Sequence, residues 1–118
     1  MGNAGFEGLE VWKKGCRLAV DVYRAFSGCR DFGFKDQICR SALSVPSNTS
    51  EGYERNSPGD FIRFLNIAKG SVGELRTQLY IAREIGYLAE IEVKDLIERS
   101  KEISAMLAGL IKSLRSKM

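Results

Sequence analysis

The sequence predicts an all-α protein: an antiparallel four-helix bundle whose helices run alternately up and down. Three observations support this class. Apolar residues recur at alternating spacings of three and four in separate segments, a pattern typical of helices that pack nearly parallel. Turn-forming residues gather at 27–35, at 56–59 and around Gly86, which leaves four segments joined by short connections. No segment shows a convincing strand pattern.

The first segment is expected to be a helix because it carries one continuous 3,4-spaced apolar row. The row consists of Leu9, Trp12, Cys16, Ala19, Tyr23 and Phe26. The second segment, 36–55, has a weaker stripe of smaller residues, formed by Ile38, Ala42, Val45, Thr49 and Gly52. Pro46 lies inside it, and a proline in a helix interior costs about 3 kcal/mol. We therefore expect a kink or a break of the second helix at Pro46.

The third and fourth segments repeat the heptad row. The third row is Phe61, Leu65, Ala68, Val72, Leu75, Leu79 and Ala82, and the fourth is Val93, Leu96, Ser100, Ile103, Leu107, Leu110 and Leu114. Ser57 can cap the third helix, with Pro58 at its first position, and Gly86 can end it.

Length and composition suit one soluble domain over residues 1–118. The chain has 118 residues, of which 44% are hydrophobic, so it can bury a core. We expect a cytoplasmic protein without a membrane span, because no long apolar run or signal segment occurs and the three cysteines form no disulfide-like pattern.

Chemistry is limited by the absence of histidine. It excludes histidine-based acid–base catalysis and the usual Cys/His zinc sites. We therefore predict no enzymatic activity, no catalytic residues, no cofactor and no metal.

A second heptad row on the third helix points to self-association. The bundle core needs only one row, and Gly70 and Gly73 beside the second row would let another backbone approach. The alternative is that a single bundle buries both rows. The expected oligomer interface comprises Phe64, Ile67, Gly70, Gly73 and Ile81.

Two polar groups admit competing interpretations. We expect the first, Asn48, Glu51, Glu74 and Gln78, to form a buried hydrogen-bond network between the second and third helices rather than an acid–base or metal site. The second comprises basic residues: Lys69, Arg76 and Arg83 at one heptad position, and Lys112, Arg115 and Lys117 as an alternative cluster. Both sets could contact RNA phosphates, but a solvated face or a favourable helix C-terminus also explains them.

Five motifs resemble the bacterial four-helix bundle proteins encoded in intervening sequences of 23S ribosomal RNA genes. They are FEGLEVWKK (Phe6–Lys14), SVPSNTSEGY (Ser44–Tyr53), FIRFLNIAKGSVGELRTQL (Phe61–Leu79), IGYL (Ile85–Leu88) and MLAGLIKSL (Met106–Leu114). The chain departs from the family at Thr49 and Ser50, where an apolar residue and an alanine are common, and at Ala89, where a capping Ser or Thr is frequent.

The resemblance implies a ring-like homo-oligomer, with a pentamer as the expected size, and no known enzymatic activity. It also implies association with ribosomal RNA, which is inferred in that family from where its genes lie. The family further resembles accessory bundle proteins that partner a reverse transcriptase and RNA, which implies an RNA–protein complex as another partner. Two function classes follow: an RNA-associated accessory protein and, as the alternative, a protein-binding scaffold without nucleic-acid contact.

Overall fold

The computed structural model describes residues 5–118, and within this range it contains helices and no strand. A short 3₁₀ turn, Phe6–Gly8, precedes four α-helices: α1 (Glu10–Ala25), α2 (Phe32–Glu54), α3 (Pro58–Ile85) and α4 (Glu90–Ser116). The predicted all-α class with four helices is confirmed. The predicted domain, residues 1–118, includes residues 1–4, which lie outside the described range.

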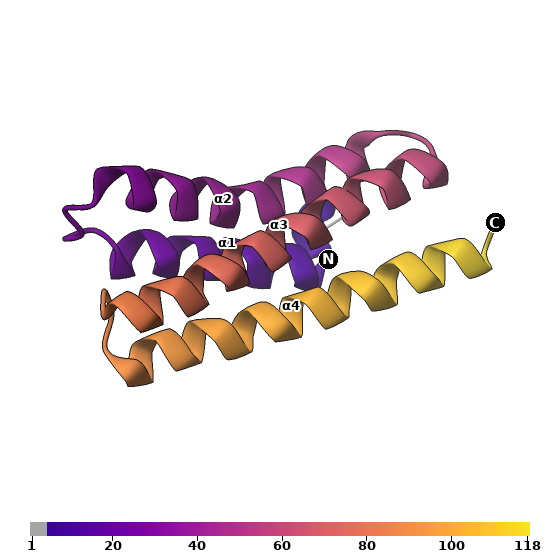
Figure 1. The fold of residues 1–118 in the computed structure, drawn as a ribbon. Coiled ribbons are helices and arrows are strands. Elements are labelled where there is room, and N and C mark those ends of the chain that lie inside the picture. Colours follow the sequence, from indigo (N-terminus) through magenta and orange to yellow (C-terminus); the bar gives the residue numbers. More distant parts are fainter. Residues whose placement is uncertain (1–4) are drawn as a thin grey trace.

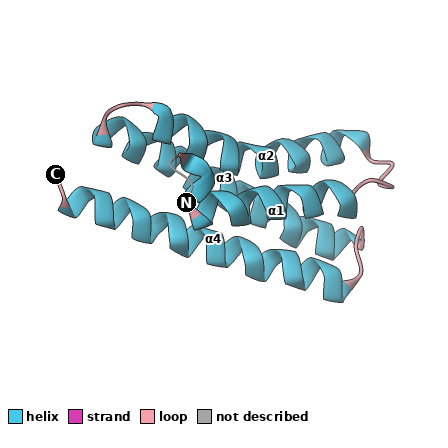
Figure 2. Ribbon diagram, turned by 180° about the vertical axis from the view of Figure 1, so that it is seen from behind, coloured by secondary structure: helices cyan, strands magenta, loops and turns pink. Residues whose placement is uncertain are grey.

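Short connections at alternating ends join the helices into an elongated bundle. The α1–α2 and α3–α4 connections lie at one end and the α2–α3 connection lies at the other (Figure 1). Each helix packs on its neighbours in the order α1, α2, α3, α4, and α4 returns to α1. The described residues extend over 45 × 26 × 23 Å. Seen from behind, α2 lies along one edge of the bundle and α4 along the other, with α1 and α3 between them (Figure 2).

Three of the four predicted apolar rows form the core. The whole stripe predicted on α2 is buried, as is the α3 row from Leu65 to Ala82 and the α4 row from Val93 to Leu107. Burial of these side chains stabilises the bundle by about 25 cal/mol per Å² of apolar surface removed from water.

The row predicted for α1 is confirmed only in part. Ala19 and Phe26 of this row are buried, but Tyr23 is exposed, and Val11, Leu18 and Val22 of a second row are buried as well. Both sets follow 3,4 spacing on the same helix, so the spacing alone does not tell which row faces inward. The outward row of α1, which includes Cys16, Val20 and Tyr23, therefore remains as an apolar surface.

Capping explains where α2 and α3 begin and end. α2 starts at Phe32, four residues earlier than predicted, because the Asp31 side chain accepts a hydrogen bond from the Phe34 amide. At α3 the Ser57 side chain accepts a hydrogen bond from the Asp60 amide, and Gly86 ends the helix with φ of 84°. Such a positive φ favours glycine because it has no Cβ.

Pro46 lies inside α2 without ending it, because the helix runs through it from Phe32 to Glu54. The predicted break is therefore wrong, whereas the kink stays a prediction. Pro46 packs against α1 at Gly15, where an added Cβ would lie 3.6 Å from the proline ring.

The α2 and α3 helices approach each other closely at Gly52. A Cβ added to Gly52 would lie 2.6 Å from the Phe64 Cβ and 3.3 Å from the Phe61 carbonyl oxygen. Neither atom is at the far end of a flexible side chain, so neither can move aside without a shift of the α3 backbone. Gly52 is thus the position at which these two helices require a glycine.

Asp31 also joins the two loops at one end of the bundle. The Tyr87 hydroxyl donates a hydrogen bond of 2.6 Å to its carboxylate, and the Tyr87 ring packs edge-on against Phe34. The hydrogen bonds from Tyr87 and from the Phe34 amide lower the pKa of Asp31, and the Asp31 partner raises the pKa of Tyr87. Each shift favours the ionisation states that form the bond.

Tyr87→Phe is expected to lower the melting temperature by a few degrees near neutral pH. A lowered folded-state pKa of Asp31 stabilises the protein above the unfolded pKa of about 4, and this contribution is lost as pH falls through the folded value. The difference between wild type and variant should therefore shrink as the pH falls through the lowered folded-state pKa of Asp31, below which the unfolded and folded carboxyls are both protonated. Calorimetry across this range checks it, and a difference that persists unchanged in acid would contradict the assignment.

Candidate nucleic-acid interface

A basic groove runs along the seam between α3 and α4. Its volume is about 410 Å³, and its walls are formed by Asn66, Lys69, Ala108, Ile111, Lys112 and Arg115. Lys69 comes from the N-terminal half of α3, and Lys112 and Arg115 come from the C-terminal half of α4. These halves meet because α3 and α4 run in opposite directions (Figure 1). The structure thus brings together members of the two basic clusters that the sequence offered as alternatives.

The cations of the groove have no acidic partner among residues 5–118. None of its lining residues is acidic, and residues 103–118 contain no Asp or Glu. By contrast, seven other cations of the described chain are in ion pairs: Lys13, Lys14, Arg40, Arg55, Arg63, Arg99 and Lys101. The charge of the groove is therefore available to an external anion.

The remaining predicted basic residues lie outside the groove lining. Arg76 and Arg83 follow Lys69 at intervals of one heptad and are half-buried. The Arg83 guanidinium lies 5.1 Å from the centre of the Tyr80 ring. Lys117 is the C-terminal cap of α4 and is exposed. None of the three forms an ion pair with another described residue.

Two lysines on α4 extend the same face and were missed from the sequence. Ala108 and Arg115 line the groove, so Lys101 and Lys94, which precede Ala108 by one and two heptads, lie on the same side of α4. Lys101 pairs with Glu98 at 3.5 Å. The heptad interval in the sequence could have identified both lysines, had the α4 cations been placed on helical faces.

The predicted four-residue polar network is wrong. Within this chain Glu74 is exposed, and Glu51 is exposed and pairs with Arg55 at 3.1 Å. The Gln78 Oε1 atom is buried without a hydrogen-bond partner among the described residues. Of the four residues, only Asn48 belongs to a hydrogen-bond network between the two helices, through its bonds to Ser44 on α2.

The network that links α2 to α3 is built on serine hydroxyls. The Ser44 and Ser71 Oγ atoms lie 2.8 Å apart, and the Asn48 amide donates to both the Ser44 hydroxyl and its carbonyl at 2.8 Å. Hydroxyls suit this position because each can donate and accept in a narrow space between helices.

The residues predicted as an oligomer interface divide into two groups. Phe64 is buried against α2, with the guanidinium groups of Arg55 and Arg63 over its ring, so its place in the interface is a wrong prediction. Ile67, Gly70 and Ile81 are exposed and Gly73 is half-buried. An added Cβ at either glycine meets nothing within 4 Å. The exposed isoleucines and the open space beside the two glycines leave this side of α3 accessible to another subunit.

Two searches of residues 5–118 bear on other site types. No group of three or more metal-ligating His, Cys, Asp or Glu side chains occurs in that range. None of its helices combines the length and the hydropathy needed to cross a bilayer.

Fold and groove together define a small all-α bundle with an unneutralised basic seam. The chain belongs to the 23S rRNA-intervening sequence protein family, whose sequence pattern matches residues 7–109. The family resemblance carried by the five motifs is therefore confirmed.

A solved structure agrees with this assignment. It is a protein of unknown function from the S23 ribosomal protein family of Bacteroides thetaiotaomicron, similar at a TM-score of 0.81 and 28% identity. The match covers 86% of this chain and 98% of the Bacteroides protein. A search of the curated proteins found no match.

Proposed function

We propose that this protein is a non-enzymatic, self-assembling accessory protein that binds RNA along the α3–α4 seam. The observation that carries the proposal is the groove in which Lys69, Lys112 and Arg115 lie together without an acidic partner among the described residues. Membership of a family described by its 23S rRNA intervening sequences supports RNA as the polyanion. We also propose that the protein acts in the cytoplasm, because its three cysteines are free thiols and the cytoplasm is reducing.

The lining of the groove favours contacts to the RNA backbone. Lysine and arginine side chains neutralise phosphates, whereas sequence-tolerant contacts to single-stranded bases use aromatic platforms. None of the six lining residues is aromatic. We therefore expect binding that tolerates changes of RNA sequence and depends steeply on salt.

Self-assembly would compensate for the modest charge of one chain. A monomer carries only +3, and one groove offers few phosphate contacts. In a pentamer, the size that we propose, five linked grooves would act on one RNA at a high effective concentration. Avidity then raises the affinity without any new contact within a subunit.

The test combines light scattering with RNA binding on the purified protein. A fluorescent stem-loop taken from 23S rRNA should bind an oligomer, and the logarithm of the association constant should fall linearly with the logarithm of salt concentration. A scrambled RNA of equal length should bind within a few-fold of the same affinity. Absence of binding at low salt by an intact oligomer would contradict the RNA assignment and favour the scaffold that binds another protein.

A further inference from the structure

The outward apolar row of α1 forms one wall of a second groove, between α1 and α2, that the proposed function does not use. The groove is lined by Cys16, Ala19, Val20, Tyr23, Arg24, Leu43 and Pro46. Val20, Tyr23 and Leu43 are 44%, 46% and 50% exposed, respectively. Clustered exposed apolar side chains of this size typically mark an interaction surface.

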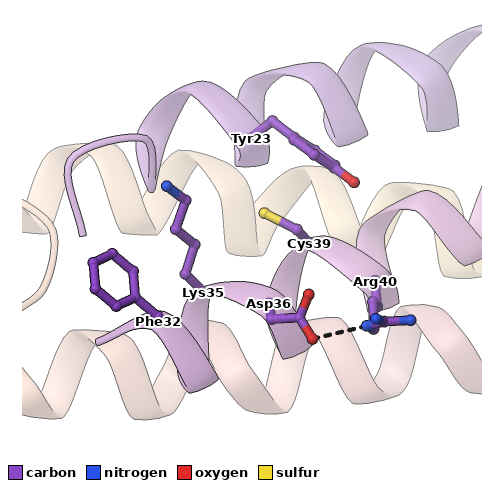
Figure 3. A pocket seen from close by; sticks show the side chains of 6 residues that line it. All are labelled: Tyr23, Phe32, Lys35, Asp36, Cys39 and Arg40. Atoms are coloured by element: carbon purple, nitrogen blue, oxygen red, sulfur yellow. Dashed lines mark hydrogen bonds and ion pairs between the residues drawn. The ribbon is translucent and has the colours of Figure 1, made fainter. Parts of the chain in front are cut away.

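A neighbouring hollow lengthens this groove along α2. Tyr23 lines both, and the second hollow adds Phe32, Lys35, Asp36, Cys39 and Arg40 (Figure 3). In Figure 3 the Tyr23 side chain extends from α1 toward Cys39 and Arg40 of α2. The two hollows together follow α2 from Phe32 to Pro46, fourteen residues or about 21 Å.

The two cysteines in the groove add to its apolar character. Burial raises the pKa of the Cys16 and Cys39 thiols, so both are neutral near pH 7. A neutral thiol packs as a small hydrophobic group. The lining therefore suits an apolar ridge of another helix.

An apolar ridge of matching length lies on the outer face of α3. Ile67, Glu74 and Ile81 follow one another at heptad intervals, and Ile67 and Ile81 are 43% and 45% exposed. Fourteen residues, or about 21 Å, separate the two isoleucines. Gly70 and Gly73 lie beside this ridge and leave space for a close backbone approach.

The charges of the two surfaces are complementary. Glu74 lies midway along the α3 ridge, is exposed and forms no ion pair with another described residue. Arg24 on the wall of the α1–α2 groove is also exposed and has no ion pair among residues 5–118. An unpaired carboxylate within an otherwise apolar ridge is best accommodated by a cation on the groove that receives it.

We propose that the α3 ridge of one copy docks into the α1–α2 groove of the next copy, with Glu74 of one facing Arg24 of the other. The proposal rests on the self-association included in the proposed function and assigns its two contact surfaces. Because ridge and groove are different surfaces, the contact is heterologous. When two copies bind in this way, one copy keeps a free groove and the other keeps a free ridge. Further copies add until a ring closes, which accounts for an assembly larger than a dimer.

A charge-exchange experiment tests the pairing. Arg24→Glu and Glu74→Arg should each weaken self-association about 100-fold, because each places like charges in contact. The double variant should restore the wild-type mass. The matched controls are Arg17→Glu on α1 and Glu84→Arg on α3, which make the same charge changes on the same helices. Arg17 lines the seam between α1 and α4 instead of the groove, and Glu84 lies beyond Ile81 at the end of the ridge. Light scattering over a dilution series gives the association constants, and circular dichroism confirms that each variant is folded.

The outcomes separate this proposal from the broader one. If the wild type is an oligomer and both single variants assemble normally, the ridge-and-groove contact is refuted while self-association stands. If the controls disrupt assembly as strongly as the single variants, the pairing is likewise refuted. A wild-type monomer at micromolar concentration would refute self-association itself. Loss of self-association in both single variants, with recovery in the double variant, supports the contact between Arg24 and Glu74.

Discussion

Replacing Lys69, Lys112 and Arg115 together with glutamine is expected to weaken binding of a single-stranded RNA about 100-fold at 0.1 M salt for each groove that the RNA occupies. Each phosphate contact releases about 0.7 counterions from a single strand, which contributes about five-fold to the association constant at this salt concentration. Removing three contacts from a groove should also lower the slope of log K against log salt by about two for each groove that the RNA occupies. Fluorescence anisotropy at several salt concentrations measures both quantities.

A control variant with the same change of net charge shows whether position matters. Lys13, Lys14 and Arg55 pair with Glu10, Glu102 and Glu51, respectively. Their replacement with glutamine should change RNA affinity only a few-fold, because these cations are already neutralised. Equal losses in the two triple variants would mean that net charge, rather than the groove, governs binding. No loss in the groove variant would identify these cations as part of a solvated face.

Gly52→Val should destabilise the fold by at least about 2 kcal/mol, because overpacking at a close contact costs about 1–3 kcal/mol or more. The added side chain must displace the Phe64 Cβ, which is fixed to the backbone of α3. A loss of this size lowers the melting temperature by roughly 8 °C in a domain of this length. Calorimetry at one protein concentration checks it, since self-association also affects melting.

Gly109→Val is the matched control for this change. It makes the same substitution within α4, at a glycine where an added Cβ meets nothing within 4 Å. Both variants replace glycine with valine within a helix. The difference between their melting temperatures therefore reports the contact between α2 and α3. Equal melting temperatures of the two variants would show that the helices can separate at Gly52 without cost.

Local sequence signals predicted α3 and α4 well because each of these helices has one dominant apolar row and α3 has clear end signals. Ser57 and Gly86 act within a few residues of themselves, so their roles do not depend on the rest of the fold. α1 differs because Leu18 and Tyr23 belong to two competing rows. Which one is buried depends on where α2 and α4 lie, and that information is not contained in the α1 segment.

The basic groove could be predicted only in pieces for the same reason. Lys69 was identified as a cation on one face of the third helix and Arg115 as a cation at the end of the fourth, but their proximity follows from the antiparallel packing of these two helices. The polar network failed because helical spacing places Glu74 relative to α3 alone. Whether that face meets α2 is decided by the rotation of the helix in the bundle, which brings Ser71 to Ser44 instead.

The unequal lengths of α1 and α4 have a consequence for the groove. The ion pairs between these helices extend from Asp21–Arg99 to Lys14–Glu102, and beyond them the end of α4 continues past the start of α1 (Figure 1). Helical turns that pack on a neighbouring helix on one side unfold locally at a lower free-energy cost than turns that pack on helices on two sides. The last turns of α4, which carry Lys112 and Arg115, are therefore expected to fray more readily than the turns of α4 that also pack on α1. A polyanion held there would order them, and its affinity includes the entropy lost in keeping those turns helical.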